Sequence, residues 1–235
     1  MLAILPIDSG RYGTKEMIEI FSEQKKINYQ LEIEGAAAIS QSEIGIIPKT
    51  VGKKILKAAT SGKITAKRIK QLEAKSDHDT AALVESLNEK CTKDVRPWIH
   101  YGLTSNDLVD TSNSMQMRDT LKIIEPKVGK LATILAQRAV KHGKIPAVGR
   151  THGQHASIIS FGLKFANWAA EMAKHVERIE EIKKRILICK TLGVVGTGSL
   201  MGAKSLEVQK RVAKRLKLYP AEVATQVVPR ERYAE

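Results

Sequence analysis

Hydrophobic positions along the chain recur mostly every three or four residues, which is the period of amphipathic helices. Two segments carry this pattern over long stretches. In the first, which follows residue 104, the spacing is that of a coiled-coil seam, with apolar residues at Met117, Leu121, Ile124, Val128, Leu131 and Leu135. Pro126 lies within it and predicts a kink or a restart. The second helix is predicted over 156–190, with an apolar face from Ile158 to Ile186.

Shorter helices are predicted before and after these two. The pattern indicates them at 15–40, 51–58, 64–72, 81–87 and 205–216. Alternation typical of strands is absent except in short pieces such as 193–195. We therefore expect an all-α chain, with a small N-terminal helical domain at 1–103 and the first part of a long-helix bundle domain at 104–235. Seams of this length need further helices to cover them, which predicts a bundle and other subunits.

Composition and charge narrow the function classes. The chain of 235 residues has 39 Lys and Arg against 25 Asp and Glu, a formal net charge of +14. Such charge suggests an anionic partner. Nucleic acid is disfavoured, because the lysines are spread along helical patterns and no aromatic-interleaved stretch could stack bases. A solvated Lys/Glu-rich surface or a highly charged small-molecule substrate remains open.

The compartment is inferred from three negative signals. The two cysteines, Cys91 and Cys189, lie far apart, which argues against a disulfide scaffold and fits a reducing cytoplasm. No run approaches the roughly 18 apolar residues of a membrane-spanning helix. The first residues show neither a positive segment nor a small-residue cleavage site, so we expect no signal peptide.

Three polar motifs each allow a structural and a functional interpretation. His78 stands between Asp77 and Asp79, either as a helix N-cap or as an acid–base or phosphate-contacting group. Thr104 and Asp107 have the spacing of a capping box, and the same helix N-terminus could bind an anion. Residues 149–155 place Arg, Thr, Gln and two His before the second long helix, as a polar helix entry or as a site.

Two decoys can be set aside. The two histidines at 152 and 155 have no third ligand at zinc spacing, so a metal site is not expected. The glycine-rich segment 193–205 matches neither the P-loop nor the dinucleotide fingerprint, and no βαβ unit surrounds it.

Taken in order, the motifs are more specific than any one alone. The series RY, HD, WIHYGLTSNDLVDT, GRTHGQHA, VGTGS and ATQVVPRERYAE resembles the adenylosuccinate lyases of the fumarase/aspartase superfamily over essentially the whole chain. The resemblance is to the N-terminal half of such enzymes, so the bundle is expected to be of the fumarase/aspartase type and truncated. It implies elimination of fumarate from adenylosuccinate, giving AMP, and from SAICAR, giving AICAR, in purine biosynthesis. It also implies a homotetramer, without cofactor, metal, nucleic acid or membrane.

The resemblance assigns roles to individual residues. It implies that Arg11 and Tyr12 contact the nucleotide phosphate, and that Thr104 and Ser105 bind the succinyl part. His78, supporting catalysis, and Asp79 would hold the substrate, with Asp77 beside them. Gln226 would bind substrate, with Arg230 and Arg232 in a basic stretch nearby. In the pair Thr151 and His152, the imidazole would be the general acid.

These residue types suit β-elimination. Removing a proton beside a carboxylate builds negative charge that hydroxyls, N–H groups and cations can stabilise, while the leaving nitrogen needs a proton donor. One departure is that the family's serine base lies on a loop of the form SSxMPxKxNP, which this sequence lacks. We therefore expect a fragment that holds the acid but not the base, and that is inactive alone. The alternatives are another superfamily lyase, such as an argininosuccinate lyase-like enzyme, and a non-catalytic helical interaction or nucleic-acid-binding fragment.

Overall fold

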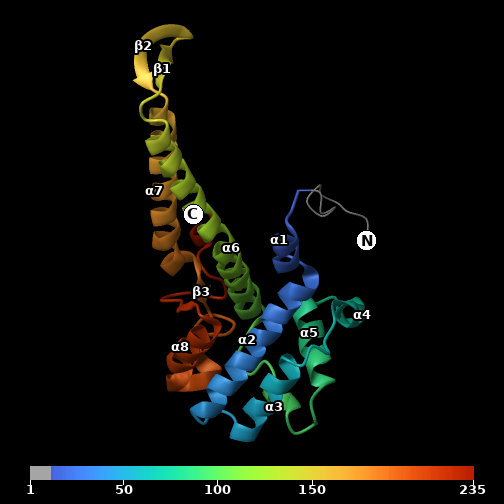
Figure 1. Cartoon of the computed structure of the whole chain (residues 1–235). Coiled ribbons are helices and arrows are strands. Elements are labelled where there is room, and N and C mark those ends of the chain that lie inside the picture. Colours follow the sequence, from blue (N-terminus) through green and yellow to red (C-terminus); the bar gives the residue numbers. More distant parts are fainter. Residues whose placement is uncertain (1–11) are drawn as a thin grey trace. The chain divides into compact units, whose positions relative to one another are not determined.

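The computed structural model describes residues 12–235, and its regular structure is nearly all helical (Figure 1). The α-helices are α1 Lys15–Ile20, α2 Glu23–Glu43, α3 Lys49–Ala59, α4 Ala66–Ser76, α5 Asp79–Asn88, α6 Ser105–Lys141, α7 Gly162–Ile186 and α8 Ser205–Leu216. The strands are β1 Pro146–Thr151 and β2 Gln154–Ser160, which pair antiparallel, and the short β3 Ile188–Cys189 and β4 Tyr219–Pro220, which pair parallel. The predicted all-α class is confirmed.

The chain divides into two compact units. The larger unit contains residues 1–118 and 184–235, and the hairpin unit contains residues 119–183. The helix α6 runs from the first unit into the second. This division follows compactness and does not test the predicted domain boundary after residue 103, which stays a prediction.

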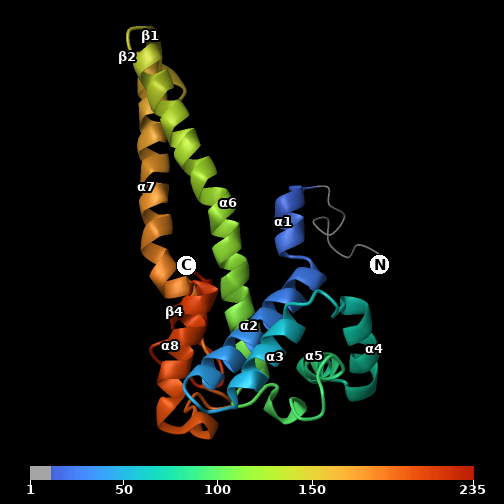
Figure 2. The ribbon, with the colours of Figure 1, turned by 60° about the horizontal axis from the view of Figure 1, so that its bottom comes forward.

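The larger unit is built around α2, which packs against α3 and α8 (Figure 2). Its core is aliphatic, as the low aromatic content requires. The fully buried side chains include Ile33, Ile55, Leu83, Leu87, Leu108 and Leu216. Glycine lets α2 and α3 approach closely: a Cβ at Gly52 would lie 2.7 Å from the carbonyl oxygen of Ala38 and would overlap Ser42.

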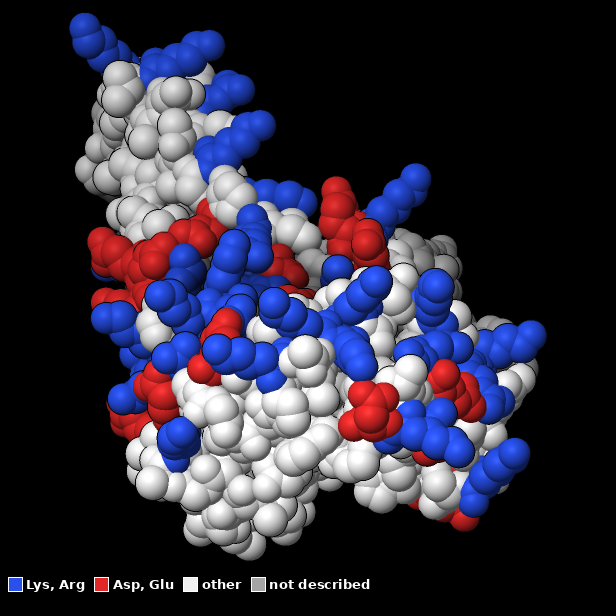
Figure 3. Space-filling model, turned by 90° about the horizontal axis from the view of Figure 1, so that it is seen from below, with Lys and Arg blue, Asp and Glu red and all other residues white. Residues whose placement is uncertain are grey.

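The surface of the larger unit is rich in cations that are interleaved with acids (Figure 3). Several form exposed ion pairs between elements, such as Lys54 with Asp94, Arg68 with Glu89, and Arg215 with Glu43. Pairs of this kind contribute little stability individually, so the surface acts mainly as a solvated, positively biased shell.

Most of the shorter helices lie where the pattern predicts them, but the predicted helix at 15–40 is divided. Ser22 ends the run by capping α2, since its hydroxyl accepts a hydrogen bond from the N–H of Lys25 at 3.2 Å. The helix α6 is longer than a break at Pro126 would allow: it continues through this proline without a restart.

The predicted helix at 156–190 is wrong at its N-terminal end. Residues 154–160 form β2, and the turn that joins it to β1 has His152 and Gly153 at φ of 54° and 74°. Positive φ at both central residues is the signature of a type I′ hairpin turn. The helix α7 begins only at Gly162, where a Cβ would overlap the carbonyl oxygen of Ala139 at the end of α6.

No helix in the described part of the chain is both long and apolar enough to cross a membrane.

The close approach of α2 and α3 can be tested with one glycine. We expect Gly52→Ala to lower the free energy of unfolding by roughly 1–3 kcal/mol, because the added methyl has no space. Gly129→Ala is the control: Gly129 is in α6 with nothing within 4 Å of an added Cβ, so the change should stabilise by about 0.5–1 kcal/mol. Thermal melts of both variants check this. An unchanged stability of Gly52→Ala would contradict the close packing of α2 and α3.

Candidate functional site

A pocket of about 310 Å³ lies in the larger unit, between the N-terminal half of α5 and the loop that leads into α6. Its lining residues are His78, Thr80, Ala81, Val84, His100, Leu103, Thr104 and Ser105. The structure thus brings the predicted site residue His78 together with Thr104 and Ser105, which follow it by more than twenty positions in the sequence.

His78 caps α5 and lines the pocket at the same time. Its Nδ1 accepts a hydrogen bond from the N–H of Ala81 at 3.2 Å, so the neutral ring carries its proton on Nε2. The structural and functional interpretations are therefore compatible. Asp79 Oδ1 lies 3.6 Å from Nδ1 and accepts a hydrogen bond from the N–H of Thr80 at 2.6 Å, while Asp77 ends α4 in a left-handed conformation.

His100 is a pocket residue that the sequence interpretation missed. Its N–H and its Nδ1 both contact the carboxylate of Glu34, at 3.1 and 2.5 Å, and Glu34 is 2% exposed in α2. His100 also has a positive φ of 61°, which this double contact helps to hold. Burial alone would lower the pKa of His100, but the hydrogen bond and charge of Glu34 outweigh it and raise this pKa. The position of His100 within the HYGLTS block was the one available signal.

One half of the predicted capping box is present at the start of α6, the contact of the carboxylate at N3 with the N–H of the N-cap residue. The buried Asp107 accepts a hydrogen bond from the N–H of Thr104 at 3.0 Å through its Oδ2. Thr104 is therefore fixed at the pocket wall by its backbone, which leaves its hydroxyl available to a ligand in the pocket.

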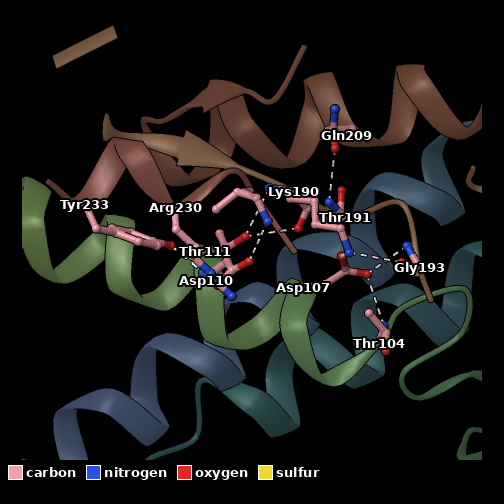
Figure 4. Close-up of polar contacts among 11 residues, drawn as sticks. Thr104, Asp107, Asp110, Thr111, Lys190, Thr191, Gly193, Gln209, Arg230 and Tyr233 are labelled. Carbon is pink, nitrogen blue, oxygen red and sulfur yellow. Dashed lines mark hydrogen bonds and ion pairs between the residues drawn. The ribbon is translucent and has the colours of Figure 1, made fainter. Parts of the chain in front are cut away.

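Asp107 is also the centre of a buried polar network (Figure 4). The same Oδ2 accepts from the N–H of Gly193 at 2.9 Å, and Oδ1 pairs with Lys190 Nζ at 2.5 Å. The side chains of Asp107 and Lys190 are both 0% exposed. Lys190 Nζ donates in addition to the carbonyl oxygen of Gly193 at 3.0 Å.

One turn along α6, Asp110 holds the last part of the chain. It accepts from the N–H of Val228 at 2.9 Å and pairs with Arg230 at 2.7 Å. The hydroxyl of Tyr233 lies 3.4 Å from the same carboxylate, and burial beside that charge raises the pKa of Tyr233 to about 12. Arg230, predicted near the site, is thus engaged by Asp110.

The remaining predicted residues lie elsewhere. Gln226 is exposed, two residues before Val228, and does not line the pocket, while Arg232 donates to the carbonyl oxygen of Arg185 at 2.7 Å. Tyr12 is 72% exposed, and Arg11 lies outside the described residues. Among the residues that the structure describes, no group of three or more His, Cys, Asp or Glu could hold a metal ion.

Thr151 and His152 occupy the turn of the hairpin unit and are exposed. Thr151 Oγ1 lies 2.7 Å from His152 Nδ1, a contact in which either atom can be the donor. His155 lies 3.0 Å through its Nε2 from the guanidinium of Arg150 on the paired strand. The two histidines thus differ in their surroundings.

Comparison with known proteins defines the class. A family model described as "Lyase" matches residues 10–235, and the chain belongs to this lyase family. It is 44% identical to the adenylosuccinate lyase of Methanocaldococcus jannaschii and 39% identical to that of Pyrococcus horikoshii, over 234 residues that cover the whole chain and 50% and 52% of those proteins. The predicted resemblance to adenylosuccinate lyases is confirmed, and the chain spans about half the length of these curated relatives.

A solved structure gives the same result for the fold. The fumarate lyase from Mesorhizobium sp. BNC1 superposes with a TM-score of 0.86 at 32% identity, covering 95% of this chain and 53% of that one. The predicted fumarase-type architecture is therefore confirmed at the level of the fold.

The contact between His100 and Glu34 predicts a pH-dependent stability. Because the fold raises the pKa of His100 above its ordinary 6.5, the stabilisation is fully present below about pH 6.5 and is lost as the pH rises through the raised value. We expect the difference in free energy of unfolding between wild type and Glu34→Gln to be largest at and below about pH 6.5 and to shrink as the pH rises above it. Urea denaturation at several pH values measures it.

Glu32→Gln, at an exposed position of the same helix, is the control and should show a small difference that does not vary with pH. A pH-independent effect of Glu34→Gln would contradict the assigned pairing.

Proposed function

We propose that the complete protein is an adenylosuccinate lyase, which cleaves the C–N bond of adenylosuccinate to AMP and fumarate, and of SAICAR to AICAR and fumarate. The observation that carries the proposal is the 44% identity to such an enzyme along the whole chain. The two distant cysteines fit a reducing compartment, and we therefore propose that the protein is cytoplasmic.

The pocket of the larger unit suits the succinyl part of the substrate. The pocket is lined by groups that can donate hydrogen bonds, namely the hydroxyls of Thr104 and Ser105 and the rings of His78 and His100. Such groups stabilise the negative charge that develops on a carboxylate when the adjacent carbon loses its proton. Asp77 and Asp79 support the position of His78.

The other roles follow the family pattern. We propose that Arg11 and Tyr12 contact the phosphate and that Gln226 binds the substrate. His152 is the general acid: because Thr151 engages Nδ1, Nε2 is the edge that donates to the leaving nitrogen. Supply of the proton by His152 as the C–N bond breaks turns a poor leaving group into a neutral amine.

We further propose that the complete protein is a homotetramer and that its sites combine residues of several subunits. The hairpin unit leaves large apolar side chains exposed, among them Leu131, Ile134, Ile158 and Trp168. In a monomer they would be an aggregation liability, and further copies of the chain would cover them.

The role of His152 can be tested by comparison with its neighbour. In the complete protein, His152→Gln should lower kcat by about 10²–10⁴-fold with a smaller change in KM, because proton donation acts in the transition state. His155→Ala should cost less, since His155 contacts Arg150 within the hairpin. Fumarate release measures both. An inactive His155→Ala beside an active His152→Gln would show that the acid is wrongly assigned.

The proposed activity itself is tested by substrate choice. We expect the complete protein to release fumarate from adenylosuccinate and not from argininosuccinate. The 235-residue chain alone should release none, because it carries no serine loop of the family form. Fumarate production by the chain alone would refute the missing base, and preference for argininosuccinate would refute the assigned substrate.

A further inference from the structure

We propose that Lys190 and Asp107 are a positioning pair for the proposed reaction: together they hold the Thr104–Ser105 segment of the pocket against the loop that begins at Gly193. This inference rests on the proposed function for its catalytic consequence. Neither residue of the pair lines the pocket, so the pair acts through the segments it holds.

Burying the charges of Lys190 and Asp107 costs free energy. A lysine that is 0% exposed is rare, and its desolvation is repaid only by close and complete pairing. A methionine or leucine of similar volume would often stabilise such a site equally well. The charges therefore call for a role beyond filling the core.

The carboxylate of Asp107 connects two separate backbone segments. Oδ2 of Asp107 accepts hydrogen bonds from two backbone N–H groups, those of Thr104 and Gly193, while Oδ1 faces the ammonium of Lys190. One carboxylate thus fixes two loops that lie 89 positions apart in sequence (193 − 104). The ammonium of Lys190 pairs with this carboxylate and also donates to the carbonyl oxygen of Gly193, so Lys190 contacts the second loop as well.

The loop at Gly193 and the loop that contains Gly102 are also in direct contact. Gly193 has a φ of 76°, and a Cβ there would lie 3.0 Å from the carbonyl oxygen of Gly102. Gly102 precedes Thr104 by two residues, so a shift of the Gly193 loop would displace the backbone behind the pocket wall.

The backbone at Lys190 and Thr191 is itself held by hydrogen bonds from two helices. Thr111 bonds both the N–H and the carbonyl oxygen of Lys190, at 3.1 and 3.0 Å, and Gln209 accepts from the N–H of Thr191 at 3.1 Å (Figure 4). The backbone that carries the ammonium is therefore fixed to α6 and α8. Thr104 is positioned from a rigid base through a single carboxylate.

The test uses the double variant Asp107→Leu with Lys190→Met, which removes both charges and the oxygen that accepts from the N–H groups of Thr104 and Gly193. In the complete protein, kcat/KM for adenylosuccinate should fall roughly 10–100-fold, mainly in kcat, because the loosened segment no longer presents its donors to the developing charge. The matched control is Ser114→Ala, which removes a buried hydrogen bond to Ile186 from the same helix and should leave kcat/KM within about twofold.

Backbone order parameters of the 235-residue chain provide the readout that does not depend on activity. For residues 102–106 and 193 they should fall from about 0.85 to below about 0.6 in the double variant and stay high in Ser114→Ala. If the double variant does not fold, Asp107→Asn alone, whose amide oxygen keeps one acceptor, is measured in the same way.

Retained kcat/KM in the double variant, or a loss of kcat/KM with the segments still rigid, would overturn the inference. An inactive wild type would refute the proposed function instead, and the order parameters would then decide whether the pair fixes the two loops.

Discussion

Two buried carboxylates in the first turns of α6 organise the larger unit. Asp107 and Asp110 lie on one face of the helix, and each accepts a backbone N–H from a segment that is distant in sequence, Gly193 or Val228. Asp107 also accepts from the nearby N–H of Thr104. Each is compensated by a cation, Lys190 or Arg230. Without these acceptors the N–H groups of Thr104, Gly193 and Val228 would be buried and unpaired, which costs about 1–3 kcal/mol each. The loops of this unit therefore take their positions from α6.

The candidate pocket inherits its geometry from this arrangement. Asp107 fixes the pocket wall at Thr104, and Glu34 fixes it at His100. Buried acids thus set both the backbone and the charge of the site, since the same Glu34 favours the protonated form of His100. The pocket therefore presents hydroxyls and imidazole rings on a backbone that buried acids hold in place.

The sequence predicts what depends on local spacing. The seam of α6, the shorter helices and the contact of Asp107 with Thr104 follow from residues three or four positions apart. The hairpin at 146–160 was missed because Ile158 continues the helical spacing toward Phe161 and Phe165, while His-Gly is a less familiar turn pair than Asn-Gly. The burial of Lys190 and the contact of His100 with Glu34 could not be predicted, because their partners lie 83 and 66 positions away.

Amide hydrogen exchange in the 235-residue chain tests the organising role of α6 most directly. The N–H groups of Thr104, Gly193 and Val228 lie in loops, where exchange is ordinarily fast, yet each donates to a buried carboxylate of α6. We expect these three amides to be protected to the same degree as the core of α6 around Leu108 and Met115. Exchange of the three at the rate of exposed loop amides would contradict it.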